Sequence, residues 1–228
     1  MAFSIFNVGT AIGLWLVITT GGCLYVSSKN GVESNIWVTL MLFFNNLNLF
    51  IAICEIILGK HIMLIKSDYK KLKEKYEGRE VSACWAFLFM PLTLAQALDG
   101  RIWSKMWSTY ALMDPSYQNH ESFGFFIDVG NGYSTIPPNL LWNYAMMFPH
   151  QVSPLWVGCI GIASYWQILY GTIIYFLSYM FNQRYKGFPL THVMGFVGVS
   201  NGIWFFFPLL GIAMSVCMLR DGNMSIFQ

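Results

Sequence analysis

Long apolar segments are the feature that most constrains this chain. Val8 to Val26 is apolar over about the 20 residues that a helix needs to cross a bilayer. Four further apolar segments follow, at Ile36 to Ile65, Phe123 to Phe148, Pro154 to Phe181 and Leu190 to Leu219. Because lipid offers no hydrogen-bond partners, the backbone of such segments must be helical. The sequence therefore predicts an all-α polytopic membrane bundle with five transmembrane helices.

The composition argues against a soluble domain. Of the 228 residues, 56% are hydrophobic and only 11% are charged, which leaves too few charges to cover a soluble surface. The net charge of +2 and the lack of a basic tail give no indication of a nucleic-acid partner, so the expected partners are the bilayer and apolar lipids. The five cysteines are widely spaced, and no CxxC or HExxH motif occurs. We therefore expect no disulfide framework, no metal and no other cofactor.

The segment Ala83 to Leu98 is apolar but short, and Pro91 interrupts it. It is expected to be interfacial or re-entrant rather than a full span. The distribution of Lys and Arg supports five crossings, because eleven of the thirteen then share one side, against eight with six crossings. This places the N-terminus in the cytoplasm. Met1 to Asn7 lacks a basic region, so the first apolar segment is interpreted as a retained span.

We expect one domain overall, with four regions along the chain. Residues 1–65 hold the first two transmembrane helices, and residues 66–122 form a polar and interfacial connector. Residues 123–219 form a three-helix core, and residues 220–228 form a short tail. The charged run from Lys66 to Glu80 predicts a solvated helical extension, since its charges are of mixed sign.

Several polar side chains occur at membrane depth, where facing lipid is costly, so each is a hypothesis for a functional site. They are Glu55, Asp128, Thr172, Asn201 and Trp204. If they converge, burial favours a protonated carboxyl group that can donate to a carbon–carbon double bond, and an indole can stabilise the resulting cation. The alternative is that the amide, hydroxyl and indole side chains only pack helices together.

Four motifs occur in a characteristic order between Ile102 and Met218. They are WSTYALMDPSY from Trp107, Asp128 ahead of Pro137, YGTIIYF from Tyr170, and NGIWFFFP from Asn201. In this order they resemble the EXPERA family of membrane proteins, which includes the emopamil-binding protein, a sterol Δ8–Δ7 isomerase, and the sigma-2 receptor. The resemblance implies a five-helix bundle around a sterol-sized cavity in the endoplasmic reticulum membrane.

The resemblance also implies roles for individual residues. Asp128 and Glu55 would be the catalytic acid and base, while the substrate-binding side chains would be Trp204, Asn201, Thr172 and Tyr170. The chain departs from the family pattern at three positions: Ile51 replaces a histidine, Asp128 replaces a glutamate, and Thr172 replaces an acid. Two functions therefore stay open. One is an isomerase that moves a sterol double bond, and the other is a noncatalytic lipid-binding protein or accessory transmembrane subunit, as a homodimer or in a larger membrane complex.

Overall fold

The computed structural model describes residues 6–120 and 122–228. The chain packs into two compact units, and several helices run from one unit into the other. Unit 1 comprises Met1–Leu14, Ala52–Gly132 and Ile174–Ser200, and unit 2 comprises Trp15–Ile51, Tyr133–Ile173 and Asn201–Gln228. Most of Met1 to Asn7, on which the interpretation of a retained first span depends, lies outside the described residues.

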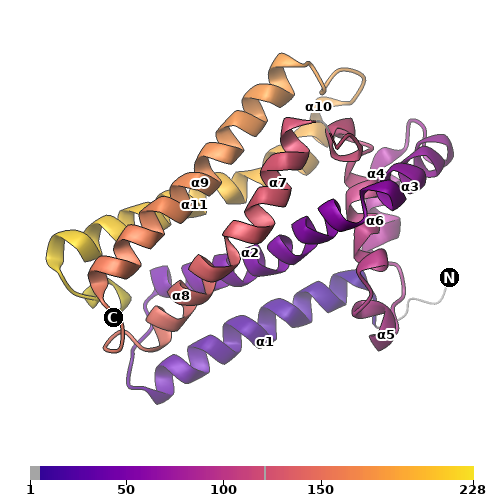
Figure 1. Cartoon of the computed structure of the whole chain (residues 1–228). Helices are drawn as coiled ribbons and strands as arrows, with labels where there is room; N and C mark the ends of the chain where they lie inside the picture. The colour runs from indigo at the N-terminus through magenta and orange to yellow at the C-terminus, as the bar shows by residue number, and fades with distance from the viewer. Residues whose placement is uncertain (1–5, 121) are drawn as a thin grey trace. The chain divides into compact units, whose positions relative to one another are not determined.

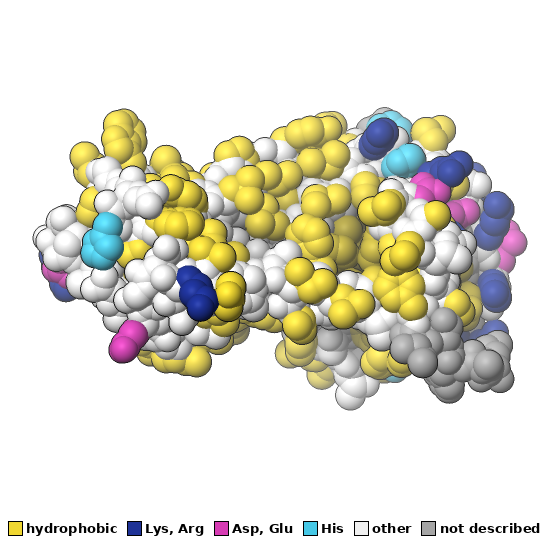
Figure 2. Space-filling view, turned by 90° about the horizontal axis from the view of Figure 1, so that it is seen from below, with side chains coloured by type: hydrophobic (Ala, Val, Ile, Leu, Met, Phe, Trp, Pro, Cys, Tyr) yellow, Lys and Arg dark blue, Asp and Glu magenta, His cyan; other side chains and the backbone are white. Residues whose placement is uncertain are grey.

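Four helical segments among the described residues are long and apolar enough to cross a membrane (Figure 1). They are α1 (Val8–Lys29), α2 (Ile36–Lys60), α9 (Pro154–Phe181) and a continuous segment that consists of α10 (Leu190–His192), a π-helical turn η2 (Val193–Gly198) and α11 (Val199–Asp221). An all-α fold with apolar helices of spanning length is therefore confirmed. Figure 2 shows hydrophobic side chains at many places on the surface, and α1 exposes Val17, Ile18 and Tyr25, as expected of a helix in contact with lipid.

The third predicted span is divided between two helices. One residue, Thr135, separates helix α7 (Phe123–Ser134) from helix α8 (Ile136–Met147), and each helix has 12 residues. Pro137 and Pro138 lie in the first turn of α8, where they lack the N–H groups that would continue the hydrogen bonds of α7. The apolar segment from Phe123 to Phe148 is thus broken at Thr135 rather than continuous.

In unit 1, the connector between α2 and α7 is built from short helices. They are α3 (Ile62–Lys75), α4 (Glu80–Leu88), α5 (Leu94–Ala97), α6 (Gly100–Tyr110) and the 3-10 turn η1 (Pro115–Gln118). Helix α6 packs against α3 and α4. The nine residues of α4 extend over only about 14 Å, too little to cross a bilayer. The segment with Pro91 instead pairs with the start of α1, where the Val8 amide donates to the Met90 carbonyl at 3.1 Å.

In unit 2, aromatic side chains form the centre of the core. Trp142 of α8 meets Tyr165 of α9 edge to face at 4.9 Å and Phe227 of the C-terminal turn η3 (Ser225–Phe227) at 5.6 Å. The helices approach closely at small residues, because a Cβ at Gly211 of α11 would lie 2.5 Å from the Tyr165 ring. Such close contacts are typical of helix pairs in membranes.

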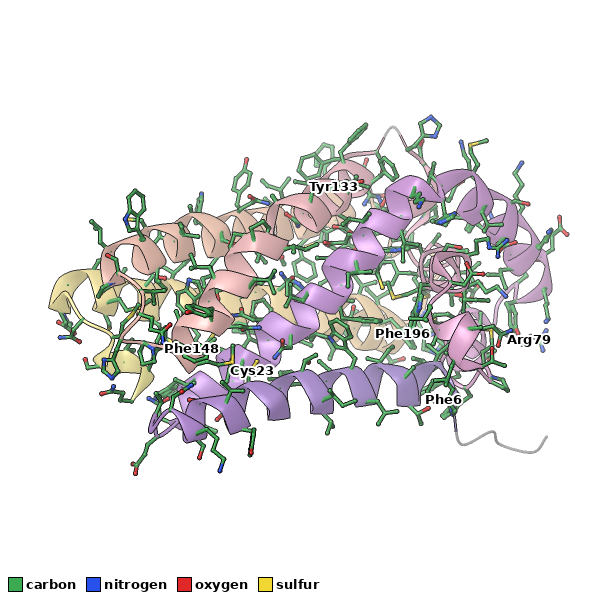
Figure 3. All side chains as sticks on the ribbon, turned by 60° about the horizontal axis from the view of Figure 1, so that its bottom comes forward. Phe6, Cys23, Arg79, Tyr133, Phe148 and Phe196 are labelled. Carbon is green, nitrogen blue, oxygen red and sulfur yellow. The ribbon has the colours of Figure 1, made fainter. Side chains whose placement is uncertain are left out.

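Within unit 2, Asn46 of α2 makes polar contacts with three residues of α1. The Trp15 indole N–H donates to the Asn46 carbonyl at 2.9 Å, and the Asn46 amide donates to the Thr20 hydroxyl at 3.3 Å. Cys23, on the side of α1 that faces α2 in Figure 3, also hydrogen-bonds to Asn46. These bonds satisfy polar groups that lipid cannot.

Candidate functional site

Unit 1 brings together the two predicted acids. Glu55 projects from α2 and is 5% exposed, and Asp128 projects from α7 and is partly exposed. Their carboxyl groups interact electrostatically. Gly132 lies one turn after Asp128, and a Cβ at this glycine would stand 2.9 Å from the Cβ of Glu55. The missing side chain therefore lets α7 approach α2 closely enough for the two carboxyl groups to interact electrostatically.

Tyr117 is a hydrogen-bond partner of Asp128 in unit 1. Burial raises the pKa of the Tyr117 hydroxyl above its ordinary value. Tyr117 therefore keeps its proton at neutral pH and donates it to the carboxyl group of Asp128. Such a bond favours the charged form of the carboxyl group.

Trp107 holds Tyr117 against α2. Its ring stacks on the Tyr117 ring at 5.3 Å, and its indole N–H donates to the Cys54 carbonyl at 2.6 Å. Cys54 precedes Glu55 in the chain, so one tryptophan connects the hydrogen-bond donor of Asp128 to the backbone beside Glu55. The sequence singled out both aromatic residues as parts of a motif but gave them no role.

One carboxyl oxygen of Glu55, Oε2, is buried without a hydrogen-bond partner among the described residues. In the same part of the chain no Lys or Arg forms an ion pair with Glu55, and no group of three or more His, Cys, Asp or Glu side chains could hold a metal ion. A buried carboxyl oxygen of this kind is costly unless something pairs with it. Glu55 is thus suited to hold or transfer a proton.

A third acid, Asp114, is neutralised by an ion pair in unit 1. Its carboxylate is fully buried, lies 3.3 Å from the guanidinium of Arg184, and accepts a bond from the Ser116 amide at 3.0 Å. The Arg184 guanidinium also donates to the Ser178 hydroxyl at 3.0 Å. The pair links the turn before η1 to the end of α9, which gives Asp114 a positioning role rather than a free acidic group.

The predicted substrate-binding residues lie in unit 2. The Trp204 indole N–H donates to the Asn48 side chain at 2.8 Å, and the Thr172 hydroxyl donates to the carbonyls of Ile168 at 3.0 Å and Trp204 at 3.1 Å. Asn201 is partly buried in the first turn of α11, directly after the π-helical turn. The structure thus brings Thr172 and Trp204 together through helix packing.

Tyr170 lies apart from Thr172. It is 49% exposed, and its ring packs beside that of Trp166 at 6.0 Å on the same helix. Two residues along a helix differ in direction by about 200°, which explains why Tyr170 faces outward while Thr172 is buried. Roles in substrate binding for these four residues stay predictions.

Comparison with known proteins gives no assignment. No family model, no curated protein and no solved structure matches the chain. The functional argument therefore depends on the residues themselves, and above all on the two acids of unit 1.

Proposed function

We propose that this chain is an EXPERA-like membrane protein that moves a carbon–carbon double bond in a sterol-like lipid by proton transfer. The observation that carries the proposal is the pairing of Glu55 with Asp128 while Oε2 of Glu55 has no partner. Two carboxyl groups in different surroundings are a common arrangement for acid and base catalysis.

The surroundings of the two acids suggest their roles. Burial favours the protonated form of both acids, but Tyr117 donates a hydrogen bond that favours the carboxylate form of Asp128, so we assign Asp128 as the base. Glu55 is buried without a cation, which favours its protonated form, so Glu55 is the acid. Glu55 would give its proton to one alkene carbon, and Asp128 would remove a proton from the carbon beside the resulting cation. The electrons of that C–H bond form the new double bond. Proton exchange with solvent then returns Asp128 to its carboxylate form and Glu55 to its acid form.

The proposed topology has five crossings. Helices α7 and α8, with 12 residues and about 18 Å each, would form the third crossing. Helices α4 and α5 would lie at the interface, and the N-terminus would be cytoplasmic. The resemblance favours the endoplasmic reticulum as the membrane.

A noncatalytic lipid-binding protein or accessory transmembrane subunit is the second candidate. It is favoured by Ile51, which replaces the histidine of the resembling family, and by the bonds that engage Trp204 and Thr172 in helix packing. The absence of a proton-transfer residue typically lowers a rate by about 10²-fold to 10⁴-fold.

Conversion of a Δ8-sterol to its Δ7 isomer by the purified protein separates the two candidates. We expect conversion by the natural chain and a loss of about 10²-fold or more in Asp128→Asn and in Glu55→Gln. Asp68→Asn, at an acid of α3 paired with Lys71 at 3.9 Å, is the matched control and should keep the rate. No conversion, with sterol binding that all variants retain, would support the noncatalytic candidate.

A further inference from the structure

Besides Asn48, whose Oδ1 accepts from Trp204 while its Nδ2 has no partner among the described residues, unit 2 contains three buried asparagines whose amide groups are not fully paired. Asn45 of α2 is 0% exposed, and Asn139 and Asn143 of α8 are 1% and 5% exposed. Four of their side-chain atoms have no hydrogen-bond partner among the described residues, namely Asn45 Nδ2, Asn139 Nδ2, Asn139 Oδ1 and Asn143 Oδ1. Because both atoms of the Asn139 amide are unpaired, this residue differs from an ordinary helix-packing contact.

Hydrogen bonds to neighbouring residues place these asparagines between three helices. Asn143 Nδ2 donates to Asn46 Oδ1 at 3.0 Å, and this bond joins α8 to α2. The Tyr165 hydroxyl donates to Asn45 Oδ1 at 2.9 Å, which joins α9 to α2. Tyr165 in turn packs against Trp142 of α8 at 4.9 Å.

The position of Asn139 on α8 directs it toward this junction. At about 100° per residue, it lies between the directions of Trp142, which meets α9, and Asn143, which meets α2. Asn139 is therefore aimed between α2 and α9, on the side where Asn45 is bonded to Tyr165. By this argument the unpaired amides of α2 and α8 are directed toward the junction of α2, α8 and α9.

The positions of the charged residues in unit 2 indicate whether a group bound by these amides would be charged or neutral. Its only Lys, Arg, Asp and Glu residues are Lys29, Glu33, Arg220 and Asp221, which lie at or beyond the ends of α1, α2 and α11. An ionised group at the junction would have no opposite charge and would be costly to bury. A neutral group that both donates and accepts fits two amide donors and two amide acceptors, and a hydroxyl has this chemistry.

We propose that Asn45, Asn139 and Asn143 bind the hydroxyl group of a neutral lipid alcohol. The Nδ2 groups of Asn45 and Asn139 donate to the hydroxyl oxygen, and an amide oxygen of Asn139 or Asn143 accepts its proton. This site uses unit 2 alone and requires neither Glu55 nor Asp128, so it is independent of the proposed proton transfer.

The test compares alcohols with their methyl ethers, which lack the proton that an amide oxygen accepts. Tritium-labelled forms of a Δ8-sterol, a diacylglycerol and the O-methyl ether of each are titrated onto the full chain in nanodiscs. The variant is Asn139→Leu, which is expected to fold because Asn139 forms no hydrogen bond through its amide. The matched control is Asn223→Leu, in the exposed C-terminal segment of unit 2.

We expect the natural chain to bind one alcohol about tenfold more tightly than its ether, as one added hydrogen bond allows. Asn139→Leu should bind the alcohol and the ether within about twofold of each other, while Asn223→Leu keeps the preference. A preference in the sterol series or in the diacylglycerol series identifies the source of the hydroxyl. Equal binding of alcohol and ether by the natural chain in both series overturns the proposal, and so does a preference that Asn139→Leu retains. Neither result depends on conversion of the sterol.

Discussion

Gly132 of α7 lies so close to Glu55 of α2 that a Cβ at the glycine would be 2.9 Å from the Cβ of the glutamate and equally close to the backbone. Gly132→Ala should therefore push the helices apart, lower the free energy of unfolding by about 1–3 kcal/mol and reduce sterol conversion. Thermal unfolding in detergent and the conversion assay measure both effects. Gly130→Ala, with no atom within 4 Å of the added Cβ, is the control and should be tolerated. Equal stability and equal sterol conversion in the two variants would contradict the close approach of α7 to α2 at Gly132.

Trp107 should stabilise unit 1 through its indole N–H as well as through its ring. Trp107→Phe keeps an aromatic ring to stack on Tyr117 but removes the donor to the Cys54 carbonyl. We expect the free energy of unfolding to fall by about 1 kcal/mol or more, because a buried carbonyl loses its side-chain donor. Trp85→Phe, at an exposed ring of α4, should change stability little. Equal stability of the two variants would argue against the bond.

The Asp114–Arg184 pair should show strong coupling, because Asp114 is fully buried. Arg184→Gln alone leaves an uncompensated carboxylate and should destabilise the protein by about 3 kcal/mol. Adding Asp114→Asn should recover part of that loss, since the buried charge is then gone while the side-chain oxygen that accepts from Ser116 is kept. A double-mutant cycle on the free energy of unfolding measures the coupling. Additive effects would mean that the ion pair contributes nothing.

Cys84 of α4 provides a test of burial in the connector. Burial raises the pKa of its thiol to about 11, so only about one thiol in a thousand is ionised at pH 8. Because the thiolate is the reactive form, alkylation by iodoacetamide should speed up about tenfold per pH unit from pH 7 to pH 10. The measurement uses a chain in which the other four cysteines are alanine. A rate that levels off near pH 9, as for a free thiol, would contradict this burial.

The sequence predicts the apolar helices because length and hydropathy act locally. The division of the segment from Phe123 to Phe148 into two helices is seen only in the structure. Contacts between segments that are distant in the sequence cannot be predicted in this way. The bond between Tyr117 and Asp128 joins a turn to a helix, and no spacing in the sequence encodes it. A tyrosine following Asp-Pro-Ser was visible, but nothing local indicated that it faces an acid.

Two details of the candidate site could have been read from helical geometry. Tyr170 and Thr172 are two residues apart and therefore point in nearly opposite directions, so a shared role in substrate binding conflicts with the period of the helix. Asn139 and Asn143 are four residues apart and share one face of α8. The sequence alone does not distinguish them, because a single amide in a membrane helix is commonly a packing contact and only the structure shows which amide atoms are unpaired.

The most direct test of the proposed proton transfer is conversion of a Δ8-sterol in D₂O, followed by mass spectrometry of the Δ7 product. If Glu55 delivers a proton that exchanges with solvent and Asp128 removes another, each product molecule gains one deuterium, and Glu55→Gln forms almost no product. A product without deuterium, an unchanged rate in Glu55→Gln, or no conversion by the natural chain would contradict the account.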